Sequence, residues 1–225
     1  MKSSFNGIKV SLIINYIIIV FVLFATVVMF TGFKFMHGME PVLESSTFGM
    51  FRFYTVDSNL LMGLAALLFV REERKLLTGK IKTIPLKYYI LKLMATVSVG
   101  LTFIVVFAYL GRISNGGIMS LLMNSNLFFH LIVPVLSIIT FSFFEKTDKI
   151  KFKHVFFGII PTIIYGIYYV INVSTHVVDG KVSPKYDWYY FAQKGLNQAY
   201  IVASCIIMIT LVITIILYFI NHNNK

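Results

Sequence analysis

The chain has 225 residues, of which 58% are hydrophobic and only 13% are charged, and its mean hydropathy is +0.83. Soluble domains are about 45–50% apolar and about 25% charged, so this composition excludes an ordinary soluble domain. The formal net charge of +11 does not indicate a nucleic-acid partner, because most of the basic residues lie in short loops between apolar segments.

Long uncharged stretches predict helices that cross a membrane. Five runs without Asp, Glu, Lys or Arg contain at least 19 residues each, and a helix needs about 20 apolar residues to cross the hydrocarbon core. A sixth stretch is long enough but contains Arg52 and Asp57. The sequence therefore predicts an all-α, polytopic membrane protein in which residues 1–225 form a single domain of six transmembrane helices. The expected spans are 8–32, 47–70, 88–111, 119–144, 154–177 and 196–221.

The distribution of basic residues predicts the orientation of these spans. Lys and Arg concentrate in the loops 71–92 and 145–154, with further lysines at Lys2, Lys9 and Lys225. Cytoplasmic loops of membrane proteins carry an excess of Lys and Arg. We therefore expect a multi-pass protein of the cell membrane with both termini in the cytoplasm, and membrane lipids as its partners.

The second span carries the first group of polar candidates. A helix that begins at Thr47, with Ser46 as its N-cap, places Thr55 about 12 Å along the helix at 1.5 Å per residue. Arg52 is long enough to reach the membrane surface, whereas Asp57 is too short to do so. Thr55 and Asn59 are four residues apart and share one face of this helix.

The fourth span carries a second, similar group. Asn124 and the three residues that follow it resemble the segment 57–60, which predicts a shared polar layer across the two helices. Asn126 and His130 share a helix face, and Pro134 follows His130 by four residues. A proline at this position frees the carbonyl group of His130 and can kink the helix there.

Thr55 and His130 are therefore predicted to lie at similar depth on two helices that can face each other. A threonine hydroxyl becomes a nucleophile when a neighbouring base accepts its proton, and histidine is the usual base near neutral pH. Asn59, Asn126 and Ser58 are candidate donors to an oxyanion. The alternative is purely structural, because polar residues of membrane helices often bond their own backbone or a neighbouring helix.

Two further features lie near the end of the fifth span. His176 lies close to Asn172 on the same helix face, and an aromatic-rich segment follows at 183–190. We interpret this segment as an interfacial aromatic belt; the alternative is a lid over a lipid-facing opening. The sequence contains no His-x-x-x-His pair or carboxylate cluster with the spacing of metal ligands, so we expect no metal and no other cofactor.

The two polar groups carry a resemblance to a known family. The segment from Arg52 to Leu60, and the segment from Asn124 through His130 to Pro134, resemble the androgen-induced integral membrane proteins that hydrolyse fatty acid esters of hydroxy fatty acids, in particular their bacterial relatives. The motif match covers about 30 residues. The resemblance implies that Thr55 is the nucleophile and His130 its partner. From their positions in the sequence, Asn59, Ser58, Asn126, Asp57, Asn124 and His176 are the further candidates for lining the pocket or binding an oxyanion.

These observations lead to the hypothesis of a membrane-embedded hydrolase of long-chain fatty acyl esters. A non-catalytic transporter or lipid-binding protein, with the polar layer as its binding site, is the first alternative. A haem protein with axial histidines is the second, and it would need opposed histidine pairs inside the bundle. The sequence indicates no oligomeric state.

Overall fold

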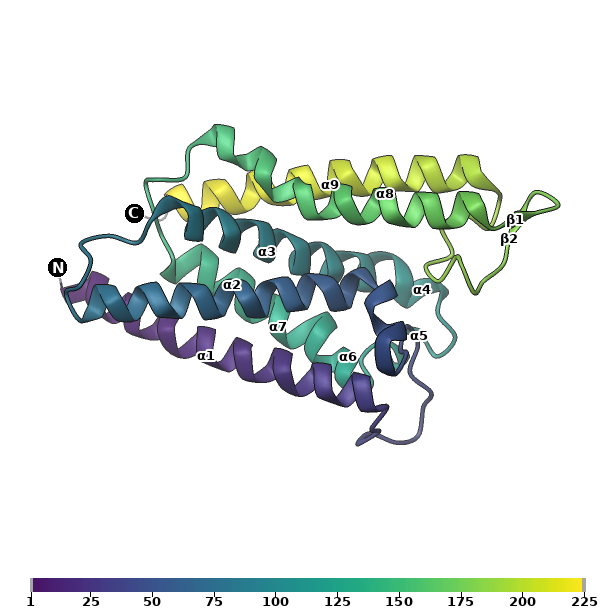
Figure 1. Ribbon diagram of the computed structural model, residues 1–225, viewed down its shortest axis with the longest axis horizontal. Helices are drawn as coiled ribbons and strands as arrows, with labels where there is room; N and C mark the ends of the chain where they lie inside the picture. The colour runs from purple at the N-terminus through teal and green to yellow at the C-terminus, as the bar shows by residue number, and fades with distance from the viewer. Residues whose placement is uncertain (1, 224–225) are drawn as a thin grey trace.

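The computed structural model describes residues 2–223, which leaves Lys225 outside the described residues, and it is mostly helical (Figure 1). Long helical segments run back and forth along one axis. Both termini lie at one end of the bundle, which we call the terminal end, and a short β-hairpin marks the opposite end, which we call the hairpin end. Within residues 2–223, five helices are long and apolar enough to cross a membrane: Asn6–Thr31, Leu86–Ile113, Ser125–Phe144, Phe152–Thr175 and Leu196–His222.

Most helix boundaries agree with the sequence prediction to within a few residues. The first span is α1 (Lys2–Thr31), the third is α3 (Leu86–Val105), which continues through a π-helical turn (Val106–Leu110) into α4 (Gly111–Ile113), and the sixth is α9 (Leu196–Asn223). The fifth span begins as a 3-10 helix (Phe152–Ile159) and continues as α8 (Ile160–Thr175). α3 contacts α2, α7, α8 and α9, and all of its residues from 92 to 102 except Met94 are buried. It is therefore the central helix of the bundle.

The second span departs from the expected regular helix. Thr47–Arg52 form a 3-10 helix, Phe53 is extended with φ −95° and ψ 125°, and α2 begins only at Tyr54 and ends at Leu77. Ser46 makes no side-chain capping bond, so its predicted N-cap role is wrong. The break coincides with the burial of Phe53 against Trp188 and Tyr189. As a result Thr55 lies in the first turn of α2, not two turns inside a helix.

The fourth span is interrupted rather than continuous from residue 119. α5 (Gly117–Ser120) ends before Asn124, which has a positive φ of 51°. The helix resumes as α6 (Ser125–Leu127), passes through a π-helical turn (Phe128–Ile132) and continues as α7 (Val133–Ile139) and a second π-helical turn (Thr140–Phe144). The irregularity that we expected near Pro134 is thus present, since proline supplies no N–H to the regular ladder and π-turns are one way to absorb the break.

The hairpin is the only strand pair in the part of the chain that the structure describes, and an all-α prediction does not include it. β1 (Val177–Val178) pairs with β2 (Lys181–Val182). Asp179 and Gly180 form the turn with φ values of 50° and 75°, the left-handed conformation that two-residue hairpin loops require. The hairpin leads directly into the aromatic segment that covers this end of the bundle.

Candidate functional site

A largely apolar cavity lies among α2, α3, α8 and α9, towards the hairpin end of the bundle. The cavity has a volume of about 70 Å³, so it is narrow compared with the roughly 300–1,000 Å³ of typical small-molecule sites. Gly166, Ala199 and Ala203 line it with small side chains, and their size explains why the helices leave space here. Such a cavity fits an apolar chain better than a polar solute.

Thr55 lies on the wall of this cavity. Thr55 is 6% exposed. It lies in the first turn of α2, beside a cavity that residues of α3 and α8 also line. Its backbone carbonyl accepts hydrogen bonds from Ser58 Oγ at 3.0 Å and from Asn59 Nδ2 at 2.8 Å. Thr55 therefore borders the cavity, while its backbone carbonyl is held by Ser58 and Asn59.

His130 is fully buried in the π-helical turn of the fourth span. Its Nδ1 lies 2.5 Å from the carbonyl oxygen of Leu121. Because a carbonyl can only accept, Nδ1 carries the proton, and Nε2 of the neutral ring is an acceptor. Nε2 is buried and has no hydrogen-bond partner among the described residues. A bound hydroxyl group would supply the missing donor.

Asn59 connects the two polar segments. Its Nδ2 donates to the carbonyl of Thr55 at 2.8 Å and to the carbonyl of Phe129 at 3.0 Å, so the backbones beside Thr55 and His130 lie within reach of one nitrogen atom. The side chains do not meet directly. Within residues 2–223, no hydrogen bond joins Thr55 Oγ1 to His130 Nε2, and His130 is not among the residues that line the cavity.

Ser58 and Asp57 lie in the wall of a second groove beside this cavity. Both line a groove between α2, α3 and α8 that is separated from the cavity by Tyr54 and Tyr165, which border both spaces. Ser58 Oγ also lies 3.2 Å from Thr102 Oγ1. Asp57 is thus directed away from the cavity that Thr55 lines, as expected from its position about 200° around the helix.

Asn124 and Asn126 hold a loop rather than line the cavity. Asn124 Oδ1 accepts from the backbone N–H groups of Phe35 and Met36 at 2.9 and 2.8 Å, and Asn126 Nδ2 donates to the carbonyl of Val42 at 2.9 Å. Ser125 Oγ donates to Glu44 in the same loop, and burial raises the pKa of the Glu44 carboxyl.

The predicted oxyanion donors are therefore already used in this structure. Asn59 Nδ2 and Asn126 Nδ2 bond main-chain carbonyls, and Ser58 Oγ bonds the carbonyl of Thr55. An oxyanion contact from Asn59 or Ser58 would first have to break one of these bonds, whereas Asn126 Nδ2 has a second N–H group beyond its bond to Val42.

The aromatic segment after the hairpin folds inward. Trp188 and Tyr189 are 8% and 6% exposed, and Phe191 just after the segment is 7% exposed, so these side chains do not form an interfacial belt, whereas Tyr186 and Tyr190 are only partly buried. The reason is a buried carboxylate: Asp187 accepts hydrogen bonds from the N–H groups of Phe191 and Ala192 and from the Tyr169 hydroxyl. These bonds fold the segment over the cavity as a cover.

His176 belongs to this cover and not to the cavity wall. Its ring stacks on Tyr186 with centroids 3.6 Å apart, and its Nδ1 lies 2.8 Å from the carbonyl of Asn172. Asn172 Nδ2 in turn donates to the carbonyl of Tyr186 at 2.7 Å. The predicted proximity of His176 and Asn172 is confirmed, and the contacts of His176 fasten the aromatic segment to the end of α8.

The sequence analysis missed the hydroxyl groups that surround Thr55 on the cavity wall. Tyr54 OH lies 2.9 Å from Thr162 Oγ1, and Tyr165 OH donates to the carbonyl of Arg52 at 2.5 Å. Tyr189 OH accepts from the N–H group of Tyr54 at 2.8 Å. One signal could have found part of this set, because residues 162, 165 and 169 have the spacing of one helix face.

No group of three or more His, Cys, Asp or Glu side chains within the described residues is arranged to hold a metal ion. The site is therefore described by its hydroxyl groups, one imidazole and an apolar cavity. Compared with known proteins, the chain matches no protein-family model, no curated protein and no solved structure.

Proposed function

We propose that this protein is a membrane-embedded hydrolase that cleaves long-chain fatty acyl esters, with Thr55 as the nucleophile and His130 as the base. The observation that carries the proposal is the pairing of two features. Thr55 borders an apolar cavity, and on the adjoining segment a buried neutral imidazole has an unpaired Nε2. The resemblance of the segments around both residues to the androgen-induced family supports the same assignment.

In the proposed reaction, Thr55 Oγ1 attacks the acyl carbonyl carbon and its proton passes to His130 Nε2. The alcohol leaves with that proton, and an acyl-threonine ester remains. Water then attacks this ester, gives a proton to Nε2, and releases the fatty acid as the threonine recovers its proton. The reaction requires the two side chains to approach when substrate binds, since catalytic hydrogen bonds of unliganded enzymes are often long and tighten in the complex.

A fluorophosphonate probe tests this proposal on the purified protein. Such probes phosphonylate activated hydroxyl nucleophiles, so we expect one label per chain, located at Thr55 by peptide mass spectrometry. Thr55→Ser should still be labelled and Thr55→Ala should not. Labelling that persists in Thr55→Ala, or a protein that hydrolyses esters without any label, would refute the assignment of the nucleophile.

The cavity predicts a chain-length effect for substitution of Gly166. A Cβ atom at Gly166 meets no other atom within 4 Å, so the backbone accepts a side chain there, and Gly166→Leu directs that side chain into the cavity that Gly166 lines, with helix propensity favouring it by about 1 kcal/mol. We expect hydrolysis of long-chain esters to fall more than about 10-fold, as expected for lost apolar pocket contacts, while short-chain esters are retained. Gly7→Leu is the matched control, because Gly7 also has free space but lies at the terminal end. Equal loss for both chain lengths would contradict the role of the cavity.

The proposal includes six spans with both termini in the cytoplasm. α2 has 24 residues and is the segment that makes the sixth span, although its terminal-end half carries several charged residues. Cys205 is the single cysteine, so cysteines introduced into a Cys205→Ser background report on orientation. A membrane-impermeant maleimide should label Lys181→Cys in intact cells and Lys80→Cys only after permeabilisation; the reverse pattern would contradict this topology.

A second candidate function is non-catalytic transport or lipid binding. The interruption of the fourth segment at Asn124 favours it, because transporters often bind substrates where membrane helices are broken. In that case the cavity would bind an acyl lipid without turnover, and Thr55→Ala would leave lipid binding unchanged.

A further inference from the structure

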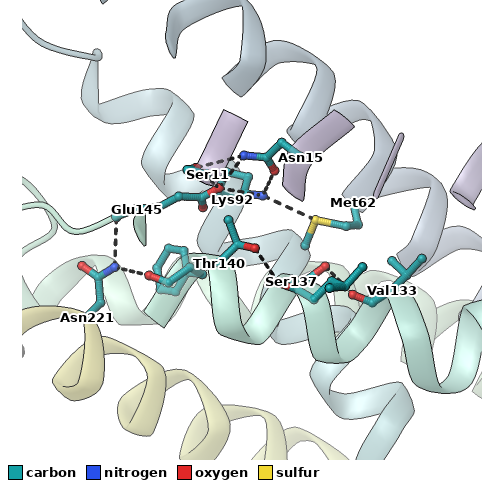
Figure 2. A network of polar contacts seen from close by, with 11 residues as sticks. Ser11, Asn15, Met62, Lys92, Val133, Ser137, Thr140, Glu145 and Asn221 are labelled. Carbon is teal, nitrogen blue, oxygen red and sulfur yellow. Dashed lines mark hydrogen bonds and ion pairs between the residues drawn. The ribbon is translucent and has the colours of Figure 1, made fainter. Parts of the chain in front are cut away.

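A charged cluster lies inside the bundle and does not border the cavity that Thr55 lines (Figure 2). Lys92 on α3 is 0% exposed, and its Nζ lies 3.1 Å from Oε1 of Glu145, which follows the fourth span. Glu73 on α2 is also buried and interacts electrostatically with both of them. Ionisable groups inside membrane helices are expensive and commonly functional.

Polar neighbours from α1 complete the surroundings of the ammonium group. Asn15 Oδ1 accepts from Lys92 Nζ at 2.7 Å, and Asn15 Nδ2 donates to Glu145 Oε1 at 2.8 Å. Ser11 Oγ lies 3.4 Å from the same oxygen, and Met62 Sδ lies 3.8 Å from Nζ. The ammonium group of Lys92 is therefore paired with Glu145 and Asn15 inside the bundle.

The cluster has more negative than positive groups. With two glutamates ionised and one lysine protonated, its net charge is −1. Buried carboxylates that share a site and lack sufficient positive charge do not all remain ionised, because burial and like charge both favour the protonated form. One added proton brings the cluster to neutrality.

Two oxygen atoms are available for that proton. Glu73 Oε2 and Glu145 Oε2 are both buried and have no hydrogen-bond partner among the described residues. The residues themselves are only 1% and 2% exposed. An unpaired carboxylate oxygen in such a place is costly, whereas a protonated oxygen can donate a hydrogen bond to its neighbour.

Water can reach the cluster from the terminal end. A wide cavity opens there and has both Glu73 and Glu145 in its wall. The titratable and charged groups around the pair from the elements packed against it are Tyr89 and Lys92 of α3, Lys82 of the α2–α3 loop, and Lys146, Asp148 and Lys149 after the fourth span. α1 and α9 contribute the uncharged Ser11, Asn15 and Asn221.

We propose that Glu73 and Glu145, with Lys92 beside them, form a binding site for one proton that exchanges with water through this cavity. The proton is held by the carboxylate pair, and the ammonium of Lys92 balances the remaining negative charge. The site is independent of ester hydrolysis, since none of its residues borders the cavity that Thr55 lines.

Infrared spectroscopy of the full-length protein as a function of pH tests this site. At neutral pH we expect a carboxylic-acid C=O band equivalent to one group per chain, which disappears on titration to alkaline pH. Glu73→Gln and Glu145→Gln should each remove that band, because either change makes the cluster neutral without a proton. Glu72→Gln is the matched control. Glu72 is the adjacent buried glutamate, but it pairs with Lys75 at 2.6 Å, so the carboxylic-acid band and its titration should be the same in Glu72→Gln as in the wild-type protein.

Thermal unfolding gives a second readout. Because the folded state holds a proton that the unfolded chain releases, the wild-type melting temperature should fall as pH rises through the titration. Glu73→Gln should abolish that fall. A wild-type protein without a titrating carboxylic-acid band would overturn the proposal even if neither Gln variant folds. A titration midpoint that depends on Na⁺ concentration would assign the site to a metal cation instead, and would also overturn it.

Discussion

Thr55→Ala is expected to lower kcat for long-chain ester hydrolysis by about 10⁴-fold or more, as removal of a nucleophile does in other hydrolases. The fold should persist, because the hydroxyl makes no hydrogen bond to any described residue, and only the backbone carbonyl of Thr55 holds Ser58 and Asn59. The measurement is the rate of fatty acid release from an acyl ester by purified protein. Thr210→Val is the control, since the Thr210 hydroxyl bonds only the carbonyl of Ile206 on its own helix.

His130→Asn separates catalysis from folding at the second position. An asparagine Nδ2 can replace Nδ1 of His130 as the donor to Leu121, whereas the acceptor at Nε2 is lost. We expect kcat to fall by about 10²–10⁴-fold, the usual contribution of a general base, with little change in melting temperature. Full activity in both His130→Asn and Thr55→Ala would show that the hydrolysis, if any, occurs elsewhere.

Lys92→Met is expected to cause the largest loss of stability. Removing the ammonium leaves Glu145 buried without its positive partner, and breaking a buried ion pair on one side costs about 3–5 kcal/mol. The free energy of unfolding can be measured by titration of the detergent-solubilised protein with SDS, followed by the fluorescence of Trp188, the single tryptophan. Lys34→Met should have no resolvable effect, because Lys34 and its partner Glu40 are both exposed.

The double variant Lys92→Met/Glu145→Gln identifies the origin of that loss. It removes both charges together, and a glutamine Oε1 can still accept from Asn15 Nδ2 as the carboxylate does. Replacement of both members of a buried pair is often close to neutral, so we expect the double variant to be more stable than Lys92→Met. A double variant as unstable as the single one would indicate that packing of the Lys92 side chain, rather than its charge, matters.

The long helices could be predicted from sequence because hydrophobic length alone determines them. The uncharged stretches that end near Thr31 and begin near Leu196 correspond closely to α1 and α9. The breaks could not be predicted in the same way. Asn124 interrupts the fourth segment where its side chain binds Phe35 and Met36, nearly ninety residues earlier in the chain, and hydropathy contains no information on such a contact.

Of the candidate site, the sequence predicted only that the backbone segments around Thr55 and His130 lie next to each other. The expected facing of the second and fourth segments appears in the contacts of Asn59 with Thr55 and Phe129. Its cavity was not predictable, because it depends on small residues of α8 and α9 and on the cover that Asp187 organises. The cluster around Lys92 also escaped the sequence analysis, since residues 71–92 were assigned to a basic loop, whereas Lys92 lies in α3 and is 0% exposed.

Trapping of the covalent intermediate tests the joint role of Thr55 and His130 most directly. The purified protein is mixed with a long-chain acyl ester, quenched in acid within the first turnover, and digested for peptide mass spectrometry. We predict an acyl group on the Thr55 hydroxyl in the wild-type protein and a much slower appearance of the same adduct in His130→Asn. Ester turnover with an unmodified Thr55, or an adduct that forms equally fast without the imidazole, would contradict it.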